Sequence, residues 1–346
     1  MPETVFTNLP PKTIVLNFQE NYDNLIVSYN TKNKNDKITI PLPIDKLNRM
    51  VIAINKIIIN TCSCGASENY PQIKTFKWFS NEVYNILIKP LESIIDGNSY
   101  LYIKTGEILN NLPFCALIDD EGKYFIRRWP RLTIAYLSNY VKLKIISNKH
   151  YILKKEKRPL IFTNSSSELK YSDYEGFKIK NLFSNGNLYR TEWTHKDILK
   201  RIIKFYSILH ISCHSFLDNK DYDLSYILLK DEHGNFAKLR TSEIEKMNLK
   251  NLELAVLATC KSGVSDCFNS NSSISSAFLK AGAKSALSTL WDISDKYTQP
   301  LIRTFYTLLN LPEKDISPAT ALLRAQQHYI KTNASPYSWA AFKIEI

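Results

Sequence analysis

Apolar positions in the first 150 residues follow two different periods. Short segments in which apolar residues cluster or alternate with polar ones are typical of β-strands, and they cover residues 14–17, 25–29, 37–42 and 101–104. Two longer segments repeat apolar residues at helical spacing, which predicts helices over residues 44–60 and 80–95. The second helix is expected to end near Gly97, because glycine commonly follows the last turn of a helix.

A polar turn is predicted over residues 119–122, where two aspartates, a glutamate and a glycine follow one another. This turn is expected to join Leu117 to a further strand over residues 124–128. The first part of the chain therefore mixes strands and helices without a regular alternation.

A charged stretch over residues 154–158 precedes Pro159 and a new apolar strand. No repeat or low-complexity tract offers a better place to divide the chain. We therefore predict two α/β parts, an N-terminal one over residues 1–157 and a C-terminal one over residues 158–346.

Beyond this boundary, apolar strands alternate with helices, which is the pattern of a parallel sheet covered by helices. The predicted strands are residues 160–163, 206–211, 254–258 and 285–290, with a hairpin over 225–239. The predicted helices are residues 192–205, 274–281, 296–309 and 318–330. Thr194 and Asp197 are spaced as in a capping box at the first of these helices, and Gly282 is expected to cap the end of the second. The fold class is α/β, with a mainly parallel sheet flanked by helices.

Two of the buried strands end in residues that carry chemistry. The strand over 206–211 runs into Ser212, Cys213 and His214, and the strand over 254–258 runs into Thr259 and Cys260. The carboxyl ends of parallel strands open into one crevice, where ligands and catalytic groups collect. A histidine and a cysteine that face each other there are the arrangement that nucleophilic cysteine catalysis requires.

The residue types fit that chemistry. A free thiol has a pKa of about 8.5, so little thiolate is present at neutral pH unless a base takes the proton. His214 would take the proton from Cys260 and return one to the leaving amine. The turn at Ser262 and Gly263 is expected to bring backbone amides toward the developing oxyanion, with the amides of Ser215 and Cys260 as donors.

Several ordered motifs resemble the CHAT family, the caspase-like domains related to caspases and separases. The histidine strand ends in the sequence HISCH over residues 210–214, and the cysteine strand ends in LATC over residues 257–260. Further similarity follows in AFLKAGA, TLWDI and WAAF, at residues 277–283, 289–293 and 339–342. Upstream, GEILNNLPFCAL at residues 106–117 is also similar to the family. The resemblance spans roughly residues 80 to 346.

The resemblance implies a caspase-like cysteine endopeptidase with His214 as base and Cys260 as nucleophile. It implies no metal and no nucleotide cofactor, a protein substrate, and control by a partner protein. It also implies that residues 1–157 form a caspase-like half without catalytic residues, and it suggests bacterial defence or regulated cell death. Ser215 stands where the family usually has glycine, so its side chain is expected to restrict the loop beside the histidine.

Other residues near these motifs are weaker candidates for a function. Asp266 could line a pocket for a basic substrate side chain, or it could be a solvated loop acid. Residues 267–276 are rich in serine and asparagine and are expected to form a mobile loop beside the site. His210 is expected to be a buried, hydrogen-bonded histidine, and Cys213 to be a packing residue.

Composition limits the function classes. The chain of 346 residues is 44% hydrophobic and 23% charged, which is ordinary for a soluble globular protein. It shows no apolar run long enough to cross a membrane and no signal peptide, so a cytoplasmic location is expected. The six cysteines are then expected to be packing residues or functional thiols. Cys62 and Cys64 have no second pair of ligands at the spacing of a zinc site.

Two alternatives remain at the level of sequence. The first is an adaptor that keeps the caspase-like fold and binds a protein without cleaving it. The second is a nucleic-acid-binding protein, which the formal net charge of +12 suggests. The lysines are spread along the chain, and no recognisable nucleic-acid-binding module is present, so direct binding of nucleic acid is not expected.

Overall fold

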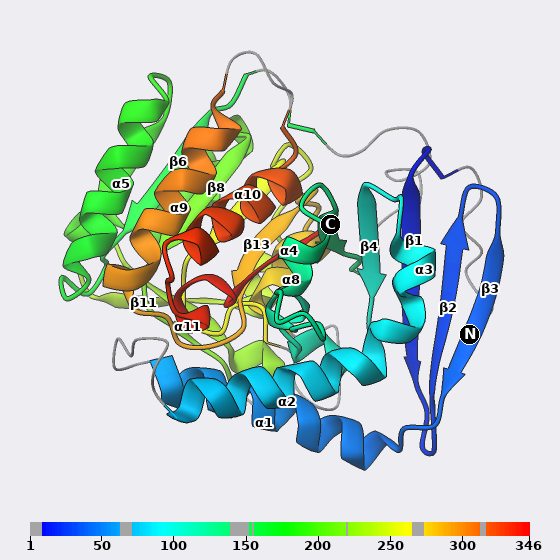
Figure 1. The fold of residues 1–346 in the computed structure, drawn as a ribbon. Coiled ribbons are helices and arrows are strands. Elements are labelled where there is room, and N and C mark those ends of the chain that lie inside the picture. Colours follow the sequence, from blue (N-terminus) through cyan, green and yellow to red (C-terminus); the bar gives the residue numbers. More distant parts are fainter. Residues whose placement is uncertain are drawn as a thin grey trace. The chain divides into compact units, whose positions relative to one another are not determined.

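The computed structural model describes residues 9–62, 71–138, 152–153, 156–218, 221–264, 273–311 and 316–346. The chain forms two compact units (Figure 1). The first comprises Met1–Leu137, Val141–Tyr151 and Gln326–Ala340, and the second comprises Ser138–Tyr140, Ile152–Ala325 and Ala341–Ile346. Within the described ranges, no helix combines the length and the apolar character that crossing a membrane requires.

The first unit is built on a mixed sheet. Its strands are β1 (Thr13–Glu20), β2 (Leu25–Thr31), β3 (Asn35–Ile40), β4 (Tyr100–Lys104) and β5 (Thr133–Tyr136). They lie in the order β3-β2-β1-β4-β5, with β1, β4 and β5 parallel and the β1–β2–β3 meander antiparallel. Its helices are α1 (Ile44–Cys62), α2 (Pro71–Leu87), α3 (Glu92–Ile95), α4 (Phe125–Arg128) and α11 (Pro336–Trp339). Short 3-10 helices lie at η1 (Lys89–Leu91), η2 (Leu109–Asn111) and η3 (Phe114–Ala116).

The second unit carries the parallel sheet that the sequence predicts. Its strands are β6 (Pro159–Thr163), β7 (Asn187–Arg190), β8 (Ile208–Ser212), β12 (Leu254–Leu257), β13 (Ala286–Thr289) and β14 (Phe342–Glu345). Their order is β14-β13-β12-β8-β6-β7, and only β14 runs antiparallel to its neighbour among these described strands. A small antiparallel sheet contains β9 (Ser215–Phe216), β10 (Tyr226–Lys230) and β11 (Phe236–Arg240).

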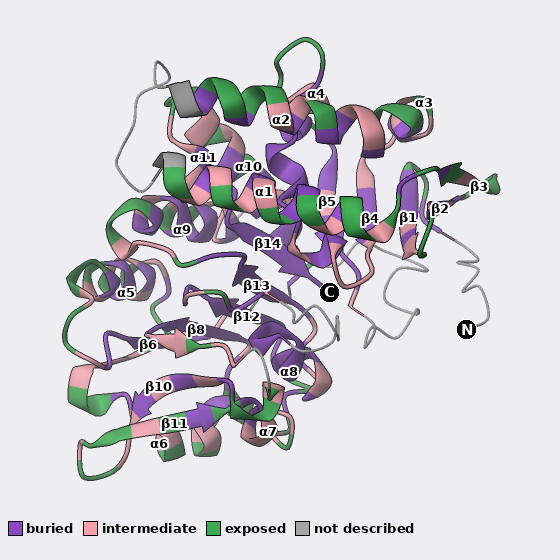
Figure 2. Cartoon of the chain, turned by 90° about the horizontal axis from the view of Figure 1, so that it is seen from below, coloured by how far each residue is buried: buried purple, intermediate pink, exposed green. Residues whose placement is uncertain are grey.

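Helices cover both faces of this sheet. They are α5 (Lys170–Leu182), α6 (Lys196–Ile202), α7 (Thr241–Ile244), α8 (Ile274–Lys280) and α9 (Asp295–Leu309), and α10 (Pro318–Lys331) leads from the second unit into the first. The 3-10 helices are η5 (Thr191–Trp193), η6 (Ile203–Phe205) and η7 (Tyr222–Leu224). Figure 2 shows α5 and α9 on one side of the strands and α8 on the other.

Burial on both faces explains why the central strands are apolar throughout. Every residue of β8 and β12 is buried, as expected for parallel strands between two helical layers. In β8, Leu209 and Ile211 join the core on the α8 side, while His210 contacts Tyr306 of α9 on the opposite side. The α/β prediction, with a mainly parallel sheet flanked by helices, is therefore confirmed.

The strand predicted over residues 124–128 is wrong, because Phe125–Arg128 forms the helical turn α4. Phe125 and Ile126 are both fully buried, and neighbouring residues of a one-sided strand point to opposite faces. The predicted turn before it is present. Its Asp119 accepts the amides of Glu121 and Lys123 at 3.0 and 2.8 Å, and the helical turn brings Arg128 back onto Asp119 at 3.0 Å.

Two helix predictions also need correction. The helix expected over residues 80–95 is interrupted, because Pro90 lies in the short helix η1 between α2 and α3. The capping box expected from Thr194 and Asp197 does not form. The N-cap of α6 is His195, and the Thr194 hydroxyl donates to the carbonyl of Thr191 at 2.6 Å.

The chain between β6 and α6 holds two elements that the hydrophobic pattern did not predict. These are helix α5 and strand β7, which pairs in parallel with β6. The end of α8 is as predicted, since Gly282 follows it with φ of +109°. The start of α8 contradicts the predicted mobile loop over residues 267–276, because residues 274–276 of that range are helical. Ser273 caps α8 by accepting the amide of Ser276 at 3.1 Å, and both serines are buried.

Candidate active site

The histidine and cysteine strand ends lie next to each other in the second unit. β8 and β12 pair in parallel with Ile211 opposite Leu257. His214 and Cys260 each follow three residues beyond this pair, and neighbouring strands are about 4.8 Å apart. The Ser215 hydroxyl also donates to the carbonyl of Cys260 at 2.6 Å. The fold thus brings the two predicted catalytic positions together at one end of the sheet.

The His214 ring faces a carboxylate from another loop. Its Nε2 lies 3.4 Å from Oε2 of Glu168, which belongs to the loop that follows β6. The side chains of His214 and Glu168 are 41% and 76% exposed, so solvent screens this contact. The Nε2 atom itself is buried and forms no directed hydrogen bond. The pair is therefore a contact at the rim of the site, and it is an ion pair only when His214 is protonated.

The loop that carries Glu168 is held in an uncommon conformation. Asn164 and Ser167 have φ angles of +54° and +67°, in the left-handed region that side chains other than Gly and Asn rarely adopt. The Asn164 amide donates to Ser212 at 3.0 Å, and its side chain accepts from the amide of Leu169 at 2.7 Å. The first bond ties the start of the loop to the histidine strand, the second joins the two ends of the loop, and Glu168 lies between these ends.

The Cys260 thiol is partly buried beside an ion pair. Its Sγ lies 3.9 Å from the carbonyl of Ile293. Burial raises the pKa of Cys260 above its ordinary value, and the Asp292 carboxylate raises it further, while Lys261 acts in the opposite direction. Lys261 and Asp292 form an ion pair at 2.8 Å. The thiol is therefore protonated at neutral pH and needs a base before it can attack.

The loop after Cys260 differs from the expected one in how it turns. Lys261 adopts the left-handed conformation, with φ of +51°. The amides of Ser262 and Gly263 donate to the Thr289 hydroxyl and carbonyl at 3.3 and 2.9 Å, so β13 occupies them. The amides of Ser262 and Gly263 are therefore not available to an oxyanion, and the predicted donors remain the amides of Ser215 and Cys260. These residues fasten the loop to the sheet.

The space around residue 263 leaves no room for a side chain, so a glycine is required there. A Cβ at this position would overlap the Ser288 hydroxyl and would lie 2.9 Å from Cε of Lys343. Ser288 and Lys343 are opposite each other in the β13–β14 pairing. The loop that carries Cys260 thus lies directly against these two strands.

A buried ion pair lies beneath this loop. Lys343 and Glu345, two residues apart on β14, form an ion pair at 3.2 Å, and their side chains are 1% and 9% exposed. The Glu345 carboxylate also accepts the hydroxyls of Ser275 and Ser288, at 2.5 and 3.1 Å. Because Ser275 donates its amide to the Ser262 carbonyl at 2.9 Å, the cluster connects α8, β13 and β14 to the Cys260 loop.

The amide of Ser215 lies outside the β9–β10 ladder. Leu228 donates its amide to the carbonyl of His214 at 2.9 Å, and Ser215 is opposite Ile227. Residues of an antiparallel pair alternate between bonded and non-bonded positions, so the amide of Ser215 points away from β10. This amide is therefore not used by the β9–β10 pairing, and the Ser215 hydroxyl bonds to the carbonyl of Cys260.

The remaining predicted residues separate into two groups. Asp266 and Cys64 lie outside the described residues, and of Cys62 only the backbone, at the end of α1, is described. His210 is fully buried, as predicted, with Nδ1 3.3 Å from the Tyr306 hydroxyl and Nε2 3.0 Å from Glu175. Cys213 is buried as predicted, and burial raises its pKa to about 11. Neither faces the Cys260 loop in the manner of a catalytic group.

Sequence reasoning missed Glu168, Asp292 and the Lys343–Glu345 pair. Glu168 lies in a loop that gave no local signal, and Asp292 lies in the segment TLWDI, which resembles the family but gave Asp292 no role beside Cys260. The pair on β14 did leave one, since two charged residues alternate with apolar ones in the final segment FKIEI. Alternate residues of a strand share a face, so opposite charges at this spacing predict an ion pair.

Comparison with known proteins gives a family and a fold. The family model described as CHAT domain matches residues 78–345. Two crystal structures of the Saccharomyces cerevisiae separase–securin complex are similar, with TM-scores of 0.62 and 0.64 and 12% identity. The matches cover 97% of this chain and 30% of the separase chain, so the chain spans less than a third of that relative.

A more distant similarity exists to the complex of Porphyromonas gingivalis RgpB pro- and mature domains, with a TM-score of 0.46 and 9% identity. It covers 78% of this chain and 67% of that one. No curated protein matches the sequence. At 12% identity, the similarity to separase shows a shared fold and not an activity.

Proposed function

Because the chain belongs to the CHAT-domain family, we propose that it is a cysteine endopeptidase with Cys260 as nucleophile and His214 as general base. One observation carries the proposal. The β8–β12 register places both residues at equal height beyond neighbouring parallel strands, at the sheet end where such folds bind ligands. The comparisons support the scaffold on which this dyad stands.

The reaction follows from these positions. His214 takes the thiol proton as Sγ of Cys260 forms a bond to the scissile carbonyl carbon, and the carbonyl becomes an oxyanion. The amides of Ser215 and Cys260 donate to that oxyanion. The C–N bond then breaks as the imidazolium gives its proton to the leaving amine, which leaves a thioester on Cys260. Water attacks the thioester while His214 accepts its proton, and the C–S bond breaks to restore the thiol.

The environment of Cys260 supports a latent resting state. A raised pKa keeps the thiol protonated, and the Lys261–Asp292 pair lies beside it. Separase, which is similar in fold, was crystallised in a complex with securin, and control by a partner protein fits a site of this kind. On this proposal the substrate is a protein, residues 1–157 are the non-catalytic half, and the setting is bacterial defence or regulated cell death.

The alternative is a caspase-like adaptor that binds a protein without cleaving it. His214 is partly exposed, and the Cys260 thiol is protonated. Both observations fit the adaptor only if Cys260 never becomes nucleophilic. The two functions therefore differ in the reactivity of one thiol.

The test compares wild type with Cys260→Ala and His214→Ala. Each protein is incubated with a cell proteome, and new N-termini are identified by mass spectrometry. Wild type is expected to generate a small set of new N-termini that both variants lack. In parallel, a chloromethyl ketone peptide should label Cys260, while the buried Cys213 serves as the internal control and stays unlabelled. Absence of both cleavage and Cys260 labelling would support the adaptor.

A further inference from the structure

Strand β7 forms an edge of the sheet in the second unit. It pairs with β6 and ends the described strand order on that side. The outer side of an edge strand presents N–H and C=O groups that can pair with another chain. Proteins usually cover such an edge or obstruct it with charge, but here a groove lies beside it.

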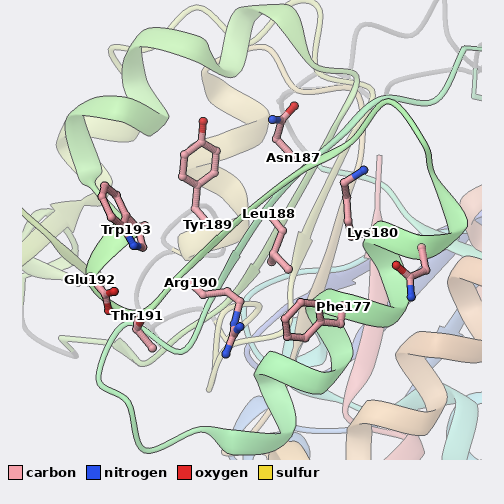
Figure 3. Close-up of a pocket in the computed structure, with 10 residues that line it drawn as sticks. Phe177, Lys180, Asn187, Leu188, Tyr189, Arg190, Thr191, Glu192 and Trp193 are labelled. Carbon is pink, nitrogen blue, oxygen red and sulfur yellow. Dashed lines mark hydrogen bonds between the residues drawn. The ribbon is translucent and has the colours of Figure 1, made fainter.

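The groove has a volume of about 780 Å³ and lies between β7 and helix α5 (Figure 3). Four consecutive β7 residues line it, so the strand edge itself forms one wall. Figure 3 shows Trp193 and Lys180 toward opposite ends, with Arg190 beside Phe177 between them. We call this surface the β7 groove and define it by Phe177, Lys180, Leu188, Tyr189, Arg190 and Trp193.

The close approach of α5 to the sheet shapes the groove. A Cβ at Gly176 would lie 2.8 Å from Cγ2 of Thr163 and 2.9 Å from Cδ1 of Leu188. The absence of a side chain at Gly176 therefore lets α5 rest on β6 and β7. The next residue, Phe177, points outward and is 46% exposed.

Part of the lining is rigid before any partner binds. The Arg190 guanidinium lies 4.5 Å from the Phe177 ring centroid. Two hydrogen bonds to Asp173, at 3.0 and 2.9 Å, fix its orientation. A flat surface held in this way loses little conformational entropy when a partner packs on it.

Exposed aromatic side chains gather around the same groove. Trp193 and Phe177, which line it, are 60% and 46% exposed, and Tyr189 lines it as well. Aromatic residues grouped on a surface are typical of binding sites, where they provide most of the affinity.

We propose that the β7 groove binds an extended, acidic segment of a partner protein, which adds a strand to β7. The strand edge supplies backbone hydrogen bonds, and the aromatic side chains supply pockets for alternate residues of the segment. Charge favours an acidic occupant, since Lys180 lines the groove and Lys178 adds a second cation on α5. Arg190 is already paired with Asp173, and Glu192 lies toward the Trp193 end. The net charge of +12 acts in the same direction at longer range.

A peptide fits this surface better than a nucleic acid does. The repeating N–H and C=O groups of a strand edge match those of another polypeptide. Binding requires no peptidase activity. If the proposed function holds, the groove also lies near the catalytic end of the sheet, because Thr163 of β6 is opposite both Arg190 and Ser212. These two residues are then about 10 Å apart, at two strand spacings.

In the test, the whole chain is used to select binding peptides from a phage-displayed library of random dodecapeptides. Enriched peptides are expected to alternate apolar residues with Asp or Glu. One such peptide, made synthetically, should bind the double variant Lys180→Glu/Trp193→Ala at least tenfold more weakly than wild type. The control variant Phe205→Ala/Lys246→Glu removes an exposed aromatic ring and reverses a charge elsewhere in the same unit, and it should bind like wild type.

Hydrogen exchange locates the bound peptide independently. Strand addition should slow amide exchange in residues 187–193, and thermal unfolding should verify that both double variants remain folded. Equal binding to all three proteins, or protection only elsewhere, would overturn the proposal. So would the absence of enriched peptides. Retention of a single-stranded poly(U) 20-mer that the Lys180→Glu/Trp193→Ala variant loses, without peptide binding, would assign the surface to nucleic acid instead.

Discussion

At the residue scale, the reactivity of Cys260 depends on two charged neighbours of opposite sign. Asp292 raises the pKa of the thiol beyond the effect of burial, and Lys261 lowers it. Their ion pair is about half exposed, so its net effect on stability is small. The effect on the thiol is different, because a carboxylate near a developing thiolate opposes its formation.

We therefore predict opposite shifts for two substitutions. Asp292→Asn removes the repulsive carboxylate and should increase the rate of Cys260 alkylation by iodoacetamide at pH 7, by a few-fold to tenfold. Lys261→Ala should decrease it. The pH dependence of alkylation, followed by mass spectrometry of the Cys260 peptide, gives the pKa of the thiol in each protein. Glu232→Gln, an exposed acid in a hairpin turn, is the control. Shifts in the same direction for both variants would contradict this account.

The proximity of His214 and Cys260 was predictable from sequence because each residue follows closely on a buried strand. The apolar runs before His214 and Cys260 are local, and parallel strands place their ends together whatever lies between them. Glu168 and Asp292 were not predictable, since their proximity to the dyad depends on loop conformations such as the left-handed Asn164 and Ser167. No local pattern encodes such contacts.

At the element scale, hydrogen bonds to β13 hold the loop that carries Cys260 in place. Thr289 binds the amides of Ser262 and Gly263, and its hydroxyl also donates to the carbonyl of Thr259 at 2.5 Å. The loop is thereby fixed on both sides of Cys260. Correct placement of the thiol thus depends on the packing of a neighbouring strand.

Gly263→Ala tests this dependence. The added methyl group overlaps Ser288, so the loop must move, at an expected cost of about 1–3 kcal/mol in the free energy of unfolding. Alkylation of Cys260 should also slow. Adding Ser288→Ala removes the overlapping hydroxyl and should restore part of both losses, as measured by chemical denaturation and labelling kinetics. If the second substitution gives no recovery, crowding at Ser288 is not the cause.

Helix α5 shows why the element prediction was incomplete. Its buried residues are Ser172, Glu175, Gly176 and Ile179. Polar and small residues face the sheet because Ser172 bonds to Ser212 and Glu175 contacts His210. The hydrophobic period that reveals other helices is therefore weak here. The same helix forms one side of the β7 groove, so the missed element is also the one that carries the binding proposal.

At the scale of the whole molecule, the Lys343–Glu345 pair connects folding stability to pH. Burial lowers the pKa of Lys343, although Glu345 opposes the shift. The folded chain then loses the Lys343 proton at a lower pH than the unfolded chain, whose lysine titrates near 10.5. Between these two values the unfolded state binds more protons, so stability from this residue rises with pH.

Lys343→Met should remove that dependence. The free energy of unfolding of wild type minus that of the variant should increase with pH up to about 10.5, with a slope of at most about 1.4 kcal/mol per pH unit. Urea denaturation of the whole chain between pH 7 and 10.5 measures it. Lys246→Met, at an exposed lysine, is the matched control and should give a flat difference. A difference that falls with rising pH would contradict the assignment.

The position of β14 in the chain also determines when the site can form during synthesis. The strand lies under the Cys260 loop, yet its residues follow those of β12 only after the chain has passed through helices of both units. At about 5–20 residues per second, a ribosome needs roughly 4 to 17 seconds to proceed from Leu257 to Lys343. During that interval the nascent chain contains the cysteine and the histidine without the strand that supports them. If the proposed peptidase function holds, this order of synthesis delays the activity until the fold is complete, so that an emerging polypeptide does not cleave itself or its neighbours.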